Sequence, residues 1–131
     1  MLLLVDTNVI SDVFHRDPVW LDWSRTAIAR HTGNLLINPL IYAELCYRAT
    51  SSGQVDQIVA DLGFRYEELP KRALFLAAQA YKSYRQRGGT KTAPLADFFI
   101  GAHAAAAGFT ILTRDTARYE TYFPNVPLIC P

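Results

Sequence analysis

The chain has 131 residues, of which 50% are hydrophobic and 19% are charged, and its formal net charge is +1. This composition is typical of a folded globular protein and excludes a disordered chain. The length predicts a single domain over residues 1–131. A net charge close to zero also excludes a strong overall field for polyanions, so any nucleic-acid binding must come from a local basic patch.

Neither a membrane span nor a secretion signal is expected. No run approaches the ~20 apolar residues that cross a bilayer, and the apolar stretch before Asp6 is too short for a signal peptide. Two cysteines lie far apart, and Cys46 sits in an apolar run, which indicates a buried thiol in a reduced protein rather than a disulfide framework. We therefore expect a cytoplasmic protein without membrane contact.

Short apolar strands alternate with helical stretches along the chain. The expected elements are a strand at 2–5, helices at 9–14 and 19–30, a strand at 35–37, helices at 39 to about 50 and 53–62, a strand at 64–67, helices at 70–87 and 94–107, a strand at 109–112, a short polar helix, and a strand at 126–129. This alternation predicts a three-layer α/β fold with a parallel sheet. Ligands of such sheets collect beyond the carboxyl ends of the strands.

Two helix ends carry recognisable signals. Asn38-Pro39 supplies a capping side chain followed by a proline at the first helical position. Gly88-Gly89 and Gly108 each follow a helical stretch, where glycine permits a left-handed stop.

Three aspartates stand at places where aspartate is common for structural reasons. Asp6 and Asp115 follow the strands at 2–5 and 109–112, and either could simply cap the next helix. Asp97 lies in the first turn of its helix, where the helix dipole favours an anion. However, the residues one and two turns after Asp97 are apolar or small, which predicts a face that packs on the sheet.

Glu44 is a less ordinary carboxylate. It lies mid-helix in PLIYAELCYRA, a segment that is apolar nearly all round and is therefore expected to be mostly buried. Glutamate is rarely buried without a partner. Arg48, one turn later, is an alternative partner in a purely structural ion pair.

Together, four carboxylates near one sheet edge need a compensating charge. Two like charges about 4 Å apart repel by ~4 kcal/mol at an effective dielectric near 20, so such a cluster needs protons, arginines or a cation. Oxygen ligands without paired histidine or cysteine suit Mg²⁺ or Mn²⁺. The three histidines show no ligand spacing and are expected on the surface or on helix flanks: His15, His31 and His103.

The sequence resembles PIN-domain ribonucleases, and among them the VapC-type toxins of bacterial and archaeal toxin–antitoxin operons. The resemblance covers nearly the whole chain. It rests on the opening strand with DTNVI, then INPLIYAEL, LADFFIGAHA, GFTILTRD and YFPNVPLI, in that order. Each motif is short, and the signal lies in their order and spacing.

The resemblance implies a five-stranded parallel sheet flanked by helices and a metal-dependent endoribonuclease. Its catalytic and metal-binding residues would be Asp6, Glu44, Asp97 and Asp115, and its cofactor would be Mg²⁺, with Mn²⁺ as an alternative. Asn8 and Thr113 match polar residues that accompany the first and last acidic positions. RNA as substrate, a cognate antitoxin as partner and a homodimer or toxin–antitoxin hetero-oligomer are also implied.

Two positions depart from the family pattern. Asn38 stands where many members carry serine or threonine, which leaves open what it contacts. Gly101 gives IGA in place of the commoner IAA, a change that still permits close packing.

Basic and aromatic residues suggest how RNA would be held. Arg85, Arg87 and Lys91 surround the two glycines of RQRGGTK, and Arg114 and Arg118 flank Asp115. These residues suit phosphate positioning, although a solvated basic loop explains Arg85 equally well. The predicted helix at 19–30 contains Trp20 and Trp23. These side chains could stack on RNA bases, or they could pack in the core or against a partner.

Other functions remain open at this point. The main alternative is a PIN-like module that binds RNA or protein without cutting. A receiver domain that accepts a phosphoryl group would need an aspartate after the third strand and a lysine after the fifth. The chain has EELP and ICP at these places, which argues against that function. A phosphatase with an aspartyl nucleophile would usually show DxD after the first strand, but the second position is Asn8.

Overall fold

The computed structural model describes residues 1–89 and 95–131. Within these residues the chain forms five strands and seven helices. In chain order they are β1 (Leu3–Val5), α1 (Thr7–Phe14), α2 (Leu21–Arg30), β2 (Leu35–Ile37), α3 (Pro39–Tyr47), α4 (Ser52–Asp61), β3 (Arg65–Tyr66), α5 (Lys71–Gln86), α6 (Leu95–Ala107), β4 (Thr110–Leu112), α7 (Ala117–Tyr122) and β5 (Leu128–Ile129).

The strands form one parallel sheet in the order β3-β2-β1-β4-β5. The chain first moves outward from β1 through β2 to β3, then returns across the sheet to β4 and continues to β5. The order therefore reverses between β1 and β4, which is where α/β sheets form their ligand crevice. The predicted five-stranded α/β fold is confirmed.

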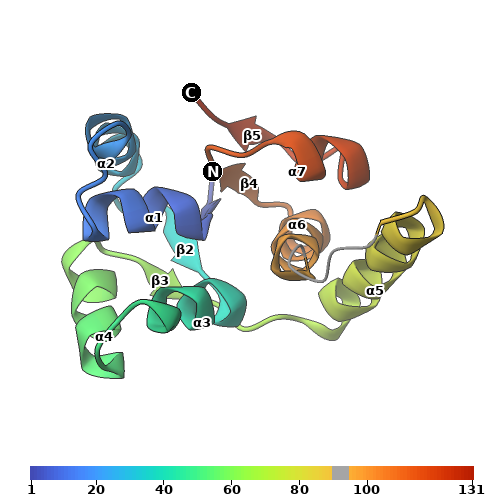
Figure 1. Cartoon of the computed structure of the whole chain (residues 1–131), viewed down its shortest axis with the longest axis horizontal. Coiled ribbons are helices and arrows are strands. Elements are labelled where there is room, and N and C mark those ends of the chain that lie inside the picture. Colours follow the sequence, from blue (N-terminus) through green and yellow to red (C-terminus); the bar gives the residue numbers. More distant parts are fainter. Residues whose placement is uncertain (90–94) are drawn as a thin grey trace.

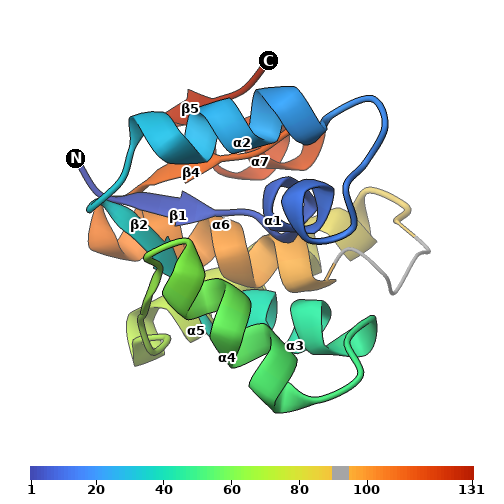
Figure 2. The same ribbon diagram turned by 90° about the vertical axis from the view of Figure 1, so that its left-hand side faces the viewer.

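Helices cover both faces of the sheet, as a parallel sheet requires. Figures 1 and 2 show α1, α2 and α4 on one side and α5, α6 and α7 on the other. Right-handed crossovers produce this division, because the chain reverses its direction across the sheet after β3. Helix α3 lies near the carboxyl ends of the strands, where it contacts α1, α4 and α6.

Burial follows the position of each strand in the sheet. Every residue of β1, β2 and β4 is buried, while the edge strands β3 and β5 are short and partly or fully exposed. Apolar runs without alternation are what strands covered on both faces need. These central strands hold the carboxyl edge rigidly in place.

The local capping signals predicted from the sequence are present. The Asn38 side chain accepts a hydrogen bond from the Ile41 amide and caps α3. Gly88 and Gly108 have φ values of +88° and +75°, in the left-handed region, within two residues after the ends of α5 and α6. Among the described residues, no helix combines the length and apolar character that a bilayer crossing requires.

Candidate active site

Asp6 is placed by the pairing of β1 with β4. Val5 is in register with Leu112, and the Asp6 amide donates a hydrogen bond to the Leu112 carbonyl at 2.9 Å. Asp6 also caps α1, because its Oδ1 accepts from the Thr7 amide at 2.8 Å. The structural explanation of Asp6 as a helix cap is therefore correct, but it accounts for only one of the two oxygens.

The second oxygen of Asp6 is held from the other side of the sheet. Its Oδ2 accepts hydrogen bonds from the Thr113 hydroxyl at 2.8 Å and from the Tyr119 hydroxyl at 2.9 Å. The residue is only 6% exposed. Tyr119 was not identified from the sequence, since nothing local in ARYETY distinguishes a tyrosine that reaches a strand end more than a hundred residues earlier.

Asn8, Thr113 and Asp115 form a hydrogen-bonded turn beside Asp6. The Asn8 amide group donates to Thr113 Oγ1 at 3.4 Å and accepts from the Arg114 amide at 3.2 Å. Thr113 Oγ1 in turn accepts from the Asp115 amide at 3.0 Å. The two residues matched to the family pattern thus shape the turn that carries Asp115, whose side chain is exposed.

Glu44 approaches the site from α3. The Thr7 hydroxyl donates to its Oε1 at 2.6 Å. The expectation that this helix is mostly buried is wrong, because Glu44 is exposed and Tyr47 is 90% exposed. Only the stripe of Ile41 and Leu45 is buried, since α3 packs at the end of the sheet rather than on its face. The ion pairs of the described residues do not include one between Glu44 and Arg48.

Asp97 enters from α6, on the opposite face of the sheet. The Arg118 guanidinium donates to its Oδ2 at 3.2 Å, and both side chains are about one-third exposed or less. The guanidinium also lies over the rings of Tyr84 and Phe98. Arg118 is therefore positioned beside the acidic residues by α7 and by an aromatic cluster.

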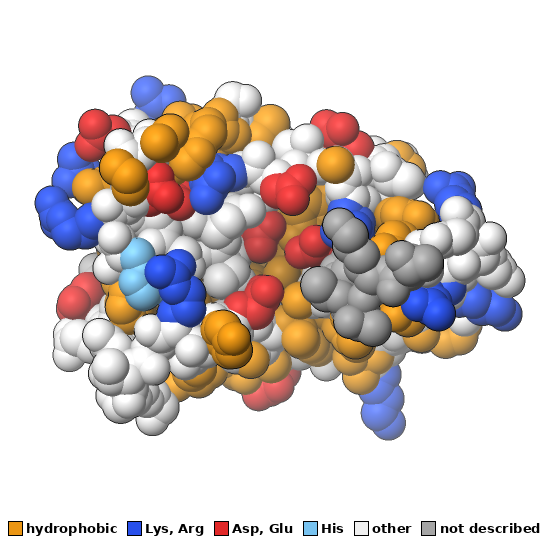
Figure 3. Space-filling model, viewed as in Figure 1, with side chains coloured by type: hydrophobic (Ala, Val, Ile, Leu, Met, Phe, Trp, Pro, Cys, Tyr) orange, Lys and Arg blue, Asp and Glu red, His pale blue; other side chains and the backbone are white. Residues whose placement is uncertain are grey.

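Three of the four carboxyl groups have a raised pKa. Burial raises the pKa of Asp6 to about 6, against the hydrogen bonds from Thr113 and Tyr119 and with further contributions from Asp97 and Glu44. Although the residue as a whole is exposed, partial burial of its carboxyl raises the pKa of Glu44, and so does Asp97. The pKa of Asp97 is raised by burial and by Asp115, although Arg118 opposes the shift. Figure 3 shows acidic side chains gathered near the middle of this face, with basic side chains on both sides.

The donor chemistry fits a divalent cation bound through oxygen. Among the described residues, the second carboxylate oxygens of Glu44 and Asp97 have no hydrogen-bond partner, and their like-charge neighbours favour a cation. No three acidic, histidine or cysteine side chains in the described ranges are close enough to form a preassembled metal cage. A shared ion would therefore need these side chains to move closer together than they are in this structure.

The basic residues named from the sequence have different surroundings. Arg114 makes a bidentate ion pair with Asp12, at 2.7 Å and 2.9 Å, and stacks over Trp20. Its guanidinium is thus already engaged by a carboxylate, which the phosphate-positioning interpretation did not foresee. Arg87 lies over the Tyr122 ring, and Lys91 falls outside the described residues.

Asp12 is a buried acid that the sequence did not single out. Besides Arg114, it accepts a hydrogen bond from the Ser24 hydroxyl at 2.6 Å, and it is 2% exposed. The ion pair joins α1 to the loop that carries Asp115, and the Ser24 hydrogen bond joins α1 to α2. The available signal was an acidic residue on the same helix face as the apolar residue Val9, one turn earlier.

The prediction that His103 lies on a surface or helix flank is wrong. His103 is 2% exposed, and its Nδ1 lies 3.2 Å from the Asn38 side-chain nitrogen. Asn38, which departs from the family pattern, therefore has two structural roles: it caps α3, and it hydrogen-bonds to the buried His103. His15 is exposed and His31 is half-buried, in line with expectation.

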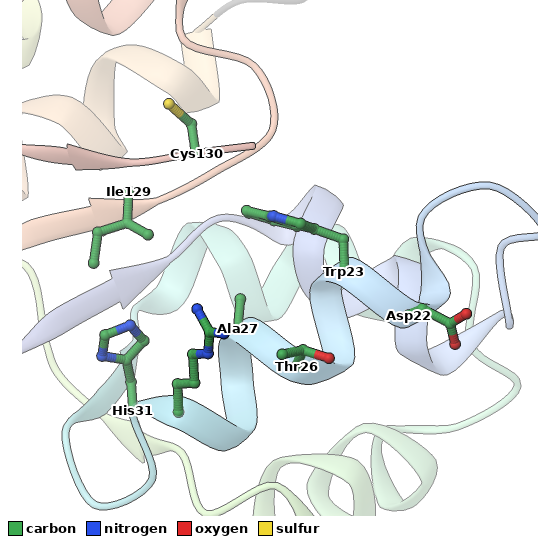
Figure 4. Close-up of a pocket in the computed structure, with 8 residues that line it drawn as sticks. Asp22, Trp23, Thr26, Ala27, His31, Ile129 and Cys130 are labelled. Atoms are coloured by element: carbon green, nitrogen blue, oxygen red, sulfur yellow. The ribbon is translucent and has the colours of Figure 1, made fainter.

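A separate cavity of about 400 Å³ lies between α2 and β5 (Figure 4). Trp23, Arg30, His31 and Cys130 contribute to its lining, and none of the four acidic residues does. Trp23 also packs against the core and makes an edge-on contact with Trp20. These contacts agree with the packing interpretation of the two tryptophans, and they leave the sheet edge as the candidate active site.

Known proteins with similar folds cover almost the whole chain. A complex described as VapBC2 from Rickettsia felis bound to a promoter DNA fragment has a chain that matches with a TM-score of 0.74 and 18% identity, over 99% of this chain and 98% of that one. FitAcB from Neisseria gonorrhoeae gives 0.71 and 20%, over 98% and 96%. At these identities the likeness shows the fold.

Sequence comparison gives the family. A plasmid stability protein, StbB of Pseudomonas syringae pv. tomato, is 29% identical over 144 aligned positions, which cover 95% of this chain and 96% of StbB. The family model described as PIN domain matches residues 3–124. Since that match spans nearly the whole sheet and all four acidic residues, the chain belongs to the PIN-domain family.

Proposed function

We propose that this protein is a Mg²⁺- or Mn²⁺-dependent endoribonuclease that hydrolyses RNA phosphodiester bonds, and the toxin of a type II toxin–antitoxin pair. The observation that carries the proposal is the convergence of four carboxylates from four different segments on one edge of the sheet, with the pKa of three of them raised. Membership of the PIN family and the similarity to toxin–antitoxin chains support it.

Three of the four acidic residues have a supporting side chain that would orient them toward an ion. Asp6 is held by Thr113 and Tyr119, and Glu44 by Thr7. Asp97 is held by Arg118. When bound at these carboxylates, the cation would supply charge stabilisation at the phosphate and a bound water of lowered pKa. No protein nucleophile is required.

Metal-dependent cleavage is the direct test of activity. Purified protein, separated from any partner, should cut structured RNA in the presence of Mg²⁺ or Mn²⁺ and stop when EDTA is added. Asp97→Asn should lose most of this activity. Asp22→Asn, which changes a highly exposed aspartate on α2, is the matched control and should remain active. Cleavage that survives both EDTA and Asp97→Asn would refute the proposal.

Thermal melts test whether Asp97 binds the metal. Added Mg²⁺ should stabilise the wild type by binding linkage, and Asp97→Asn should lose most of that gain. In EDTA the variant should be as stable as the wild type or more so, because one repelling charge is gone. If Asp97 only interacts favourably with the dipole of α6 and binds no metal, Mg²⁺ should shift the melting temperature of both proteins equally.

An antitoxin is the partner we propose for this toxin. A further structural neighbour, with a TM-score of 0.71 and 20% identity, is described as a toxin–antitoxin complex from Klebsiella pneumoniae. Tyr47, 90% exposed on the same helix as Glu44, provides apolar area at the site for a partner segment. Expression alone should arrest growth, and co-expression with the adjacent short open reading frame should restore it. Unaffected growth with all four acids intact would count against the toxin role.

The alternative of a catalytically silent binding module predicts RNA binding without cleavage under any metal condition. The same assays separate the two functions. A homodimer is also proposed from the family, and sedimentation equilibrium would test it.

A further inference from the structure

A cavity of about 430 Å³ lies directly beside the acidic site. We call it the α1 cavity, and its lining residues are Asn8, Ser11, Asp12, His15, Asp17, Pro18, Arg48 and Arg114. It adjoins the site through Asn8, which hydrogen-bonds to Thr113 and to the Arg114 backbone. Its volume lies in the range of about 300–1,000 Å³ that is usual for small-ligand sites.

The acidic side chains of the α1 cavity are already engaged. Asp12 is held by the bidentate contact with Arg114 and by Ser24. Asp17 accepts the amide hydrogens of Val19 and Trp20 through one oxygen. The two aspartates and the two arginines of this wall carry equal and opposite formal charges. Arg114 is paired with Asp12, so Arg48 is the arginine without a carboxylate partner among the described residues.

Arg48 is the arginine of the α1 cavity that has no interaction partner among the described residues. It is exposed, and within the described residues its guanidinium takes part in no ion pair, hydrogen bond or stacking contact. His15 lines the same cavity as Arg48. Burial is the main cause that lowers the pKa of His15, and the charge of Arg48 lowers it further. The His15 ring also lies 4.7 Å from the Phe14 ring, centroid to centroid. The cavity thus combines a free guanidinium with an aromatic edge.

Asp115 itself lines a second cavity. It measures about 370 Å³, and Asp115 lines it together with Arg118, Tyr84 and Tyr122. Arg114, the chain neighbour of Asp115, lines the α1 cavity instead. Two consecutive residues, Arg114 and Asp115, thus line two different cavities, and each cavity has an arginine in its lining. Figure 3 shows acidic side chains on this face with a histidine and a basic side chain on one side of them and basic side chains on the other.

This arrangement suits an extended polyanion. Acidic residues repel a phosphate chain, so a strand that crosses them must be held by cations on either side. A guanidinium recognises phosphate through two parallel hydrogen bonds, and its contact fixes position without reading sequence. We propose that the α1 cavity is a phosphate-binding subsite for the RNA strand, in which Arg48, assisted by His15, holds a phosphate next to the one that is cut.

This proposal rests on the ribonuclease function proposed above, and substrate kinetics test it. Arg48→Gln should raise KM for a short single-stranded RNA about 3- to 10-fold and leave kcat within about twofold, because a positioning contact is lost without change to the acidic residues. Arg48→Lys should restore part of the affinity by keeping the charge. The matched control is Arg72→Gln, an exposed arginine on α5 that lines neither cavity beside Asp115.

Salt dependence gives a readout that a structural role would not change. Loss of one phosphate contact should reduce the slope of log affinity against log salt by about 0.7 for a single strand. KM and salt slope in Arg48→Gln that equal those of Arg72→Gln would overturn the subsite.

Binding measurements separate failure of the subsite from failure of the function. Fluorescence anisotropy with the same RNA in EDTA, where the proposed metal-dependent hydrolysis stops, measures affinity independently of cleavage. Weaker binding by Arg48→Gln supports the subsite even if no metal condition gives cleavage, in which case only the nuclease proposal fails. If Arg48→Gln weakens binding of a polyglutamate peptide but not of RNA, the cavity serves a protein partner and the proposal is wrong.

Discussion

At the scale of single residues, Asp6 shows how one side chain can serve the fold and the site together. Its Oδ1 caps α1, and its Oδ2 receives two hydroxyl groups from β4 and α7. The carboxyl is nearly buried and has no arginine or lysine partner among the described residues. Burial is therefore the largest cause of its raised pKa, and this has a cost for stability at neutral pH.

Stability should depend on pH through Asp6. Its pKa is about 6 in the folded protein against an ordinary value of 3.8, so the folded state holds the proton more tightly. The stabilisation from that proton is fully present below about pH 4 and is lost as pH rises through about 6, at most ~3 kcal/mol. Asp6→Asn stays neutral and should escape this loss.

Urea unfolding in EDTA at several pH values between 4 and 7 measures the effect. The variant should gain stability relative to the wild type as pH rises, by about 1–3 kcal/mol at pH 7. A stability difference that does not change with pH would show that the Asp6 carboxyl titrates normally. The control is Asp22→Asn, which should follow the wild type.

At the scale of elements, the position of α3 depends on a buried polar pair. Asn38 Oδ1 accepts from the Ile41 amide, which fixes the orientation of the side-chain amide. Its nitrogen therefore faces His103 Nδ1 as a donor, so that Nδ1 must accept and the neutral ring must carry its proton on Nε2. The pair links the N-terminal end of α3 to α6. Helix α3 carries Glu44, and helix α6 carries Asp97.

Asn38→Ala should destabilise the protein more than the loss of a cap alone. A missing cap costs about 1 kcal/mol, and the unpaired nitrogen of buried His103 adds about 1–3 kcal/mol. His103→Phe should remove that second penalty, so the double variant should be more stable than the sum of the single effects predicts. Urea unfolding of all four proteins checks this. Additive effects would mean that the two side chains act independently.

At the scale of the whole molecule, the site is assembled from both faces of the sheet. Asp6 and Asp115 follow the adjacent central strands β1 and β4, Glu44 comes from α3, and Asp97 comes from α6. Helix α7 joins these parts, because it supplies Tyr119 to Asp6 and Arg118 to Asp97. Packing of α7 against α6 should therefore matter for activity as well as for stability.

Gly101→Ala tests this packing. A Cβ at Gly101 would overlap the ring of Phe123, which is 8% exposed and directly follows α7. Overpacking of this kind should cost about 1–3 kcal/mol and displace α7 from the site. Phe123→Leu should recover part of the loss in the double variant. The glycine of IGA is thus needed because a large ring packs on it.

The matched control is Gly53→Ala in α4. A Cβ there would meet only the Ser51 hydroxyl oxygen at 3.7 Å, and helical Gly→Ala substitutions at compatible sites stabilise by about 0.4–1 kcal/mol. Thermal melts should therefore move in opposite directions for the two variants. Equal shifts would show that the contact with Phe123 is not limiting.

The sequence by itself determined the parts of this protein that depend on near neighbours. Apolar runs without alternation marked the three buried strands, and Gly88 and Gly108 marked helix ends. Because parallel strands end at one edge, the positions of Asp6 and Asp115 followed from these strands. Only the tertiary structure decided the rest: the exposure of Glu44, the burial of His103, and the contacts of Tyr119 and Asp12. The partners of Asp6 lie 107 and 113 residues away in the chain, whereas sequence periodicity reports only on residues within one or two turns. Which face of an apolar helix is covered, and which polar groups meet beneath it, depends on packing between distant segments.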